Sequence, residues 1–255
     1  AELAKEYDTG LHTHSLETAF QAEIAKKMYG KPMIMHLSEI GCLNERTSLV
    51  HSVWMEESEV KEAAECGAIV VHNPGSNLLL GSGIAPVNMY RDLGLKIAIG
   101  TDGANCGGNL NMFESMRLAA TIHKVSEKNP DKWITAYEVL RMATQNSAGV
   151  ALTQNEVGSL GVGKKADITI INPRRSTAMV PLIDPIWQML YSESGSGVET
   201  VLVNGRVVLE NGKVVMIDED KVYAEAEKRA QRIMERTVSY KEANDNFASI
   251  IKESL

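Results

Sequence analysis

The sequence has few cysteines, no long apolar run and no visible leader. Its three cysteines, Cys42, Cys66 and Cys106, are odd in number and unrelated in spacing, which predicts free thiols in a reducing compartment. No apolar run approaches the ~18 residues of a membrane span, and no charged-then-apolar segment opens the chain. We therefore expect a cytoplasmic protein without a membrane partner.

Basic residues are not in excess either. The 255 residues include 26 Lys and Arg against 33 Asp and Glu, a formal net charge of −7, with 44% hydrophobic residues. A net negative charge disfavours binding to a polyanion, so we expect no nucleic-acid partner. The composition is that of an ordinary soluble enzyme.

Apolar strand-like runs alternate with helical stretches up to about residue 152. Strands are predicted at 10–14 and in runs that end at His51, His72 and Asp102. Helices are predicted over 19–29, 56–66, 86–93, 110–126 and 133–152, with Gly-rich loops after His72 and over 103–108. Strands that alternate with helices pair in parallel and are buried on both faces.

Each of the four predicted strands ends in a polar, chemically competent residue: His14, His51, His72 and Asp102. Polar residues at the C-terminal ends of consecutive strands are typical of a (β/α)₈ TIM barrel. An open doubly wound sheet binds ligands only near its switch point, so four contributing strands favour the barrel. Four βα units make half of one.

The pattern changes after about residue 155. Short β-branched runs surround Asn-Gly pairs at Asn204 and Asn211, which predicts antiparallel hairpins. From 218 to about 240 the chain is rich in Ala, Glu, Lys and Arg, and we interpret it as a solvent-facing helix. The expected domains are 1–155, the half-barrel; 156–217, accessory β-sandwich strands; and 218–255, a C-terminal helix.

Several motifs resemble the amidohydrolase superfamily, in the branch of metal-dependent aminohydrolases that includes S-adenosylhomocysteine, methylthioadenosine and guanine deaminases and triazine hydrolases. They are His14-Ser-Leu-Glu17, Leu49-Val-His51, His72-Asn-Pro-Gly-Ser-Asn77, Gly100-Thr-Asp102, the run from Gly158 to Ile168, and Val203-Asn-Gly-Arg206. The resemblance covers nearly the whole chain. It implies the C-terminal portion of the family, strands 5–8 of the barrel, with a small accessory β-sandwich.

The resemblance also implies roles for four residues. His14 and Asp102 would bind one divalent ion, with Zn²⁺ as the first candidate and Fe²⁺ or Mn²⁺ as alternatives. Glu17 would protonate a ring nitrogen of the substrate, and His51 would hold the attacking hydroxide. Asp102 would also accept a proton from the attacking water and pass it to the departing ammonia.

Other residues are assigned secondary or structural roles. Trp54, His72 and Asn77 are expected to bind substrate, with His72 ordering its loop by hydrogen bonding. His12 is expected on the opposite strand face from His14, where it would pack rather than ligate. His36-Leu-Ser-Glu39 repeats the His-x-x-Glu spacing and His123 falls within a helix; both are expected to be structural, and a metal role is not expected for Cys106.

The function implied is hydrolysis of a carbon–nitrogen bond that is not a peptide, namely deamination of an aminated, purine-like N-heterocycle by a metal-bound hydroxide. Removal of chloride or an alkylamine from a triazine-like ring is an alternative within enzymes. A metal-free structural homologue is the alternative outside them. The expected partners are a small heterocycle and further copies of the chain, as a homo-oligomer.

The family's first-strand His-x-His pair has no counterpart here. The chain opens on Ala1 without Met, in a helix-like stretch that ends at Tyr7. A barrel with extras typically exceeds ~250 residues, so we expect a preceding segment of roughly 200 residues that carries two further His ligands. The fragment alone is expected to be inactive.

Overall fold

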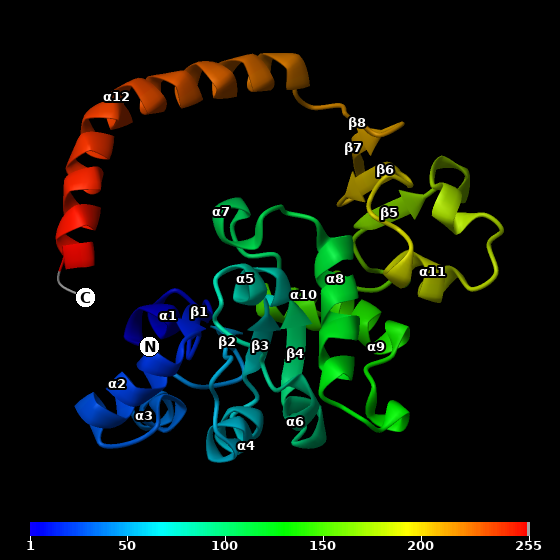
Figure 1. Ribbon diagram of the computed structural model, residues 1–255. Helices are drawn as coiled ribbons and strands as arrows, with labels where there is room; N and C mark the ends of the chain where they lie inside the picture. Colours follow the sequence, from blue (N-terminus) through cyan, green and yellow to red (C-terminus); the bar gives the residue numbers. More distant parts are fainter. Residues whose placement is uncertain (254–255) are drawn as a thin grey trace.

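The first half of the chain forms a four-stranded parallel sheet covered by helices (Figure 1). The computed structural model describes the backbone of residues 1–253 and the side chains of residues 1–237. The parallel strands are β1 (Leu11–Ser15), β2 (Thr47–His51), β3 (Ile69–His72) and β4 (Lys96–Ile99), hydrogen-bonded in that order. Because β1 and β4 are both edges, the described residues form no closed barrel. The fold is the TIM-barrel-like α/β arrangement expected.

Helices precede and follow the parallel strands in sequence. They are α1 (Glu2–Glu6), α2 (Ala19–Tyr29), α3 (Met33–Glu39), α4 (Glu57–Glu65), α5 (Pro74–Leu79), α6 (Val87–Asp92), α7 (Ala104–Gly107), α8 (Met112–Thr121), α9 (Ala136–Arg141) and α10 (Ser147–Val150). Short 3₁₀ turns η1 (Ile122–Val125) and η2 (Pro130–Lys132) follow α8, and a π-helical stretch, η3 (Met142–Asn146), joins α9 to α10.

The sheet is buried on both faces, as its continuous apolar strands predict. Leu49, Val70 and Ile97 face the helical layer, where they share one core cluster with residues of α4, α6 and α8. Val50 and Val71 point to the opposite face, in a second cluster with Ala98 and the half-buried Val150 of α10. Burial on both faces fixes the position of all four strand ends.

Local sequence signals set several helix limits where expected. Thr18 caps α2 in a reciprocal capping box with Gln21, and Gly30 ends it in the left-handed conformation with φ of 69°. Thr135 and Glu138 form the same box at the start of α9. The helices predicted over 56–66 and 86–93 are confirmed as α4 and α6.

Three local predictions were wrong. The stretch after His72, expected to be a loop, begins with helix α5, because Pro74 occupies the first helical turn, where its missing N–H costs nothing. Strand β4 ends at Ile99, three residues before Asp102. Within the expected loop 103–108, α7 forms a single helical turn.

The second half of the chain contains a four-stranded antiparallel sheet. Its strands are β5 (Ile168–Ile171), β6 (Val198–Val203), β7 (Arg206–Glu210) and β8 (Lys213–Val214). The predicted hairpins are present, with Asn204, Gly205, Asn211 and Gly212 all at positive φ. A second sheet packed on this one, as a β-sandwich requires, is absent among residues 1–253.

Helices flank this antiparallel sheet in sequence. Short turns η4 (Pro173–Arg175) and η5 (Thr177–Met179) and helix α11 (Pro185–Tyr191) separate β5 from β6. Helix α12 (Glu219–Glu253) extends away from the sheet in Figure 1, and its side chains over 221–237 are exposed, as predicted for a solvent-facing helix. None of the helices within the described residues is long and apolar enough to cross a membrane.

Candidate active site

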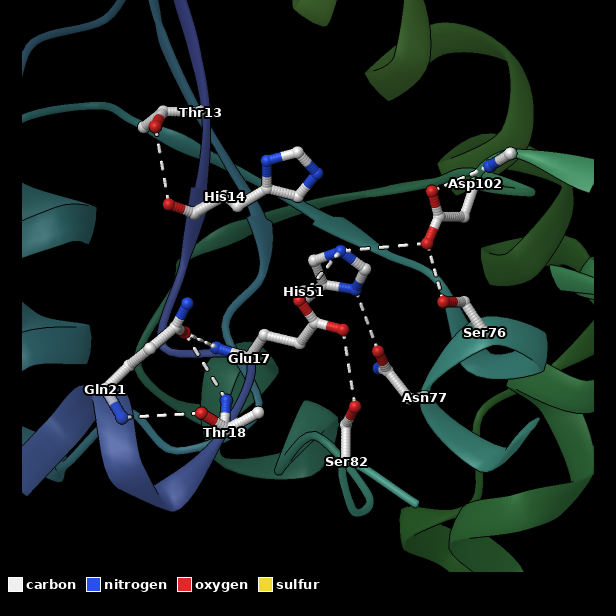
Figure 2. A network of polar contacts seen from close by, with 11 residues as sticks. Thr13, His14, Glu17, Thr18, Gln21, His51, Ser76, Asn77, Ser82 and Asp102 are labelled. Carbon is white, nitrogen blue, oxygen red and sulfur yellow. Dashed lines mark hydrogen bonds and ion pairs between the residues drawn. The ribbon is translucent and has the colours of Figure 1, made fainter. Parts of the chain in front are cut away.

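Three of the predicted site residues meet at the C-terminal edge of the parallel sheet (Figure 2). Nε2 of His51 lies 3.8 Å from Oε2 of Glu17 and 3.8 Å from Oδ2 of Asp102. The His51 side chain is 1% exposed, and the two carboxylates are about one-fifth exposed. An imidazole between two carboxylates can hold or move a proton, which is acid–base chemistry.

The backbone around this cluster adopts an uncommon conformation. Leu16, His51, Ser52 and Asp102 have φ between 48° and 67°, in the left-handed region that residues other than glycine seldom occupy. Each such residue costs on the order of 1–3 kcal/mol and persists only where the surrounding structure holds it. The left-handed turns redirect the chain at the strand ends, and they bring Asp102 back to His51 although β4 has already ended.

Side chains from α5 and the loop after it hold the cluster. Ser76 donates a 2.6 Å hydrogen bond to Oδ2 of Asp102, and Ser82 donates a 3.3 Å hydrogen bond to Oε1 of Glu17. Nδ1 of His51 lies 2.9 Å from Oδ1 of Asn77. Sequence reasoning gave neither serine a role, although Ser76 lies within the motif from His72 to Asn77 and Ser82 follows that motif.

The carboxyl group of Asp102 favours its ionised form. Burial by itself would raise the pKa of Asp102, but the Ser76 hydroxyl and the N–H of Gly103 donate hydrogen bonds to the carboxylate, and His51 and His14 lie nearby. Their combined effect places the pKa of Asp102 below its usual value. An ionised carboxylate can act as a metal ligand or accept a proton.

His14 is the fourth predicted member of the cluster. It lies in β1, exposed, and its ring stacks on that of His51 with centroids 5.4 Å apart. No hydrogen bond engages either ring nitrogen within the described part of the chain, so both are free for a ligand. The imidazole of His14 and the carboxylate of Asp102 are donor types that suit Zn²⁺.

These two donors do not complete a metal site. Catalytic zinc has three protein ligands, and no group of three or more His, Cys, Asp or Glu residues able to hold an ion occurs among the described residues. The residues present therefore fit a divalent ion in part. A complete zinc site at this edge would need at least one further ligand.

The position predicted for His12 was wrong. Residues two apart in a strand point to the same face, and the register pairs His12 with Ser48 and His14 with Val50 on one side of the sheet. Nδ1 of His12 lies 2.6 Å from the Ser48 hydroxyl. His12 is thus held by Ser48 on the face that also carries His14.

The second His-x-x-Glu lies in helix α3, which the sequence analysis did not predict. His36 and Glu39 belong to α3; the His36 ring stacks on Tyr29, and Glu39 pairs with Lys31 at 2.5 Å. These surface contacts leave no link to His51. His36 and Glu39 are therefore not part of the cluster.

The residues expected to bind substrate lie at different depths. Trp54 is 45% exposed, and its indole N–H donates to the backbone carbonyl of Ser82 at 2.8 Å. Asn77 is 1% exposed and His72 is 2% exposed, so both are buried. The hydrogen bonding expected of His72 is absent, since neither of its ring nitrogens has a partner within residues 1–237.

His72 packs instead against His123 of η1, with ring centroids 5.5 Å apart. Burial lowers the pKa of His72 to about 3, with smaller effects from His123 and His51, and burial together with Arg91 lowers the pKa of His123 to about 4. Both rings are therefore neutral at physiological pH. His123 lies buried in the 3₁₀ turn η1 and not in the expected helix, and its structural role stays a prediction.

This histidine pair predicts acid sensitivity. A lowered pKa means that the unfolded chain binds more protons than the folded one below pH ~6.5, so unfolding becomes easier as the pH falls toward 4 and 3. Each histidine contributes a slope of about 1.4 kcal/mol per pH unit. In the His123→Phe protein, the unfolding free energy should fall less steeply with decreasing pH than in the wild type, by that amount. Urea titrations at several pH values between 6.5 and 4.5 measure this slope. An unchanged slope would contradict the assignment.

An apolar cavity lies away from the cluster. It measures about 820 Å³, between helices α8 to α10 and strand β5, and Met116, Leu140 and Ile168 contribute to its wall. None of Glu17, His51 and Asp102 lines it. The acid–base chemistry is therefore located at the sheet edge and not in this cavity.

A parallel α/β sheet with an acid–base cluster and a partial metal-ligand set at its C-terminal edge defines a TIM-barrel-like hydrolase class. The amidohydrolase family model matches residues 1–208, and the chain belongs to this family. It is 38% identical over 238 residues to a 5-methylthioadenosine/S-adenosylhomocysteine deaminase of Caldanaerobacter subterraneus subsp. tengcongensis, a match that covers 93% of this chain and 54% of the relative.

Solved structures agree with the family. A zinc-bound adenosine deaminase from Xanthomonas campestris superimposes with a TM-score of 0.87 at 30% identity, over 91% of this chain and 53% of that one. Atrazine chlorohydrolase from Arthrobacter aurescens, complexed with zinc, gives a TM-score of 0.82 at 32% identity, over 88% and 49%. The chain spans about half the length of the relatives it matches. These matches do not support the expected placement in the C-terminal portion of the family.

Proposed function

We propose that the protein containing this chain is a metal-dependent hydrolase that deaminates an aminated N-heterocycle of the purine kind. The observation that carries the proposal is the meeting of Glu17, His51 and Asp102, with Nε2 of His51 3.8 Å from a carboxylate oxygen of each partner. Deamination of a ring needs an acid for the ring nitrogen and a base for water. The deaminase names of similar proteins support the same reaction.

Each residue of the cluster has a role that its surroundings favour. Glu17, with Oε2 open toward His51, gives a proton to the ring nitrogen next to the carbon under attack. Asp102, ionised, accepts a proton from the attacking water and returns it to the departing ammonia. His51 orients that water and stabilises the charge that develops on it. Trp54, exposed beside Ser82, is the residue of this set placed to contact the substrate ring.

His14 and Asp102 would hold the divalent ion, for which zinc is the best candidate because similar structures contain it. When bound, such an ion lowers the pKa of a water molecule toward ~7. We propose that the remaining ligands come from parts of the protein beyond the described residues. The same parts would supply strands for the open edges of β1 and β4 and so close a barrel.

The domain division expected from the sequence remains part of the proposal. Residues 1–155 form the catalytic half-barrel, 156–217 the accessory β strands and 218–255 the C-terminal helix region. The last two residues of this region lie outside the described residues. Free thiols at Cys42, Cys66 and Cys106 support a cytoplasmic location. The expected homo-oligomer remains a prediction.

The full-length, metal-loaded protein should release ammonia from aminated purine nucleosides. We would assay 5-methylthioadenosine, S-adenosylhomocysteine, adenosine and guanine, and measure ammonia together with the loss of the amino-purine absorbance. The control is the Asp102→Asn protein, which lacks the base and should release none. Absence of ammonia from every ring at full metal occupancy would overturn the proposed function.

A second reaction deserves the same assay. The alternative is the hydrolytic removal of chloride or an alkylamine from a triazine ring. The similarity to atrazine chlorohydrolase, with a TM-score of 0.82, favours it. Chloride release without ammonia release would select it. A protein that binds no metal and acts on neither ring class would instead be a structural homologue.

A further inference from the structure

Helix α12 leaves its apolar side chains exposed in the single chain. Every side chain over 221–237 is exposed, and Tyr223, Ile233 and Met234 leave between 60% and 69% of their surface open. Figure 1 shows the first half of α12 lying apart from both sheets. Most of the stability of a protein helix comes from packing one apolar face against a partner. Residues 221–237 gain little of this packing within the described chain, so α12 has an apolar face to cover.

The apolar residues of α12 form one stripe along the helix. Four of them follow one another at intervals of three, four and three residues: Tyr223, Ala226, Ala230 and Ile233. Side chains at such intervals lie on one side of a helix, and two helices that pack along a common line use the same spacing. We call these four residues the α12 seam. Exposed Val222 and Met234 border it.

The α12 seam is symmetric about its own midpoint, Lys228. Two copies of α12 that run antiparallel across a twofold axis place Tyr223 of each copy beside Ile233 of the other. At the centre, Ala226 of each copy lies beside Ala230 of the other. An isologous interface is reciprocal in this way. The two small central residues let the helices approach closely, because the distance between packed helices depends on the side chains at their contact.

The charge of this region also reverses near Lys228. Over 218–227 five acidic residues accompany one basic residue, whereas over 228–236 four basic residues accompany one acidic residue. In an antiparallel pair the acidic segment of each copy lies along the basic segment of the other. A parallel pair would bring acidic next to acidic and basic next to basic. Because complementary charge selects the partner and orientation of an interface, these charges favour the antiparallel pair.

We propose that α12 is a self-association helix, through which two copies of the protein pair antiparallel along the α12 seam. A second copy is the partner that fits, because it brings both the reversed seam and the reversed charge. The described part of the seam is short, so the interface is of the small kind, and its assembly depends on protein concentration. None of Glu17, His51 and Asp102 belongs to α12, so the pairing can be measured independently of turnover.

Cysteine cross-linking of the full-length protein tests the direction of the pair. Ala226→Cys and Ala230→Cys are made as separate variants, one of them with a size tag, mixed under reducing conditions and then oxidised. The mixed dimer should cross-link, because position 226 of one copy lies beside position 230 of the other. Each variant alone should cross-link far less, since a disulfide requires Cα atoms within about 7 Å.

The wild type, with its three native cysteines, gives the background for this experiment. A mixed dimer that cross-links no more than the wild type would overturn the proposal. Cross-linking of each variant with itself in preference to the mixed dimer would also overturn it, because that pattern belongs to a parallel pair.

Sedimentation of the full-length protein measures the strength of the pair. The wild type should change from monomer to dimer between about 1 and 100 μM. Ile233→Glu places a charge in the seam of both copies and should weaken dimerisation at least ~10²-fold. Gln231→Glu is the matched control: it adds the same charge two residues away on the other side of the helix, and should change the dissociation constant less than ~5-fold.

Both substituted side chains are exposed in the single chain, so both variants should fold as the wild type does, which circular dichroism would show. A wild-type protein that stays monomeric up to about 100 μM would overturn the proposal. An Ile233→Glu protein that dimerises as tightly as the wild type would do the same.

Discussion

Replacing Glu17 by Gln in the full-length protein should lower kcat by ~10²- to 10⁴-fold, the usual loss when a general acid is removed. The amide of Gln keeps an oxygen that can accept the hydrogen bond from Ser82, so the side chain stays in place. What it loses is the carboxyl oxygen beside His51 that would carry the proton in the proposed reaction. Metal content and KM should change little, which steady-state kinetics and elemental analysis would show together.

Glu39→Gln is the matched control because Glu39 also follows a histidine by three residues. Glu39 ends helix α3 and pairs only with the surface residue Lys31, so its replacement should be nearly silent. The opposite outcome, a sensitive Glu39 and a tolerant Glu17, would mean that the active site has been assigned to the wrong motif. Every later role assignment would then have to be redrawn.

His14→Ala should lower metal content as well as rate. The imidazole of His14 has no hydrogen-bond partner in the described chain, so it contributes only through a ligand and through the stack on His51. Mutating a residue that only hydrogen-bonds to a metal ligand typically lowers metal affinity about 10- to 100-fold. Loss of a ligand itself should therefore weaken ion binding by at least ~10²-fold. Zinc titration of the chelator-treated protein measures this affinity directly.

The control for this prediction is His36→Ala. His36 stacks on Tyr29 in the surface helix α3, and its removal should leave zinc affinity and kcat unchanged. The fold should also survive His14→Ala, since His14 is exposed in the sheet edge strand β1. A His14→Ala protein that binds zinc as tightly as wild type would remove His14 from the ligand set.

Local signals in the sequence determined the elements that carry the site. Apolar runs that end at His51 and His72 gave the limits of two buried strands, and Thr18 with Gly30 gave both ends of the first long helix. These predictions of strand and helix limits succeed because helix caps and buried strands are specified by neighbouring residues, within one turn of helix or one run of β-branched side chains. The grouping of Glu17, His51 and Asp102 in one site was implied by the resemblance to the amidohydrolase superfamily, and parallel pairing contributes by bringing the strand ends to one edge of the sheet.

Only the tertiary structure decided how those residues are oriented. Ser82 is 65 residues from Glu17 in sequence, and Asn77 is 26 from His51. Their contacts depend on helix α5 and the loop after it, which lie next to the sheet edge. The sequence analysis predicted only a loop here, because the segment is rich in Gly, Ser and Asn. Asp102 reaches His51 through a left-handed turn beyond β4, not from the strand itself. A strand pattern gives the order and direction of side chains, whereas the orientation of His51 and Glu17 depends on long-range hydrogen bonds that form only when the chain is folded.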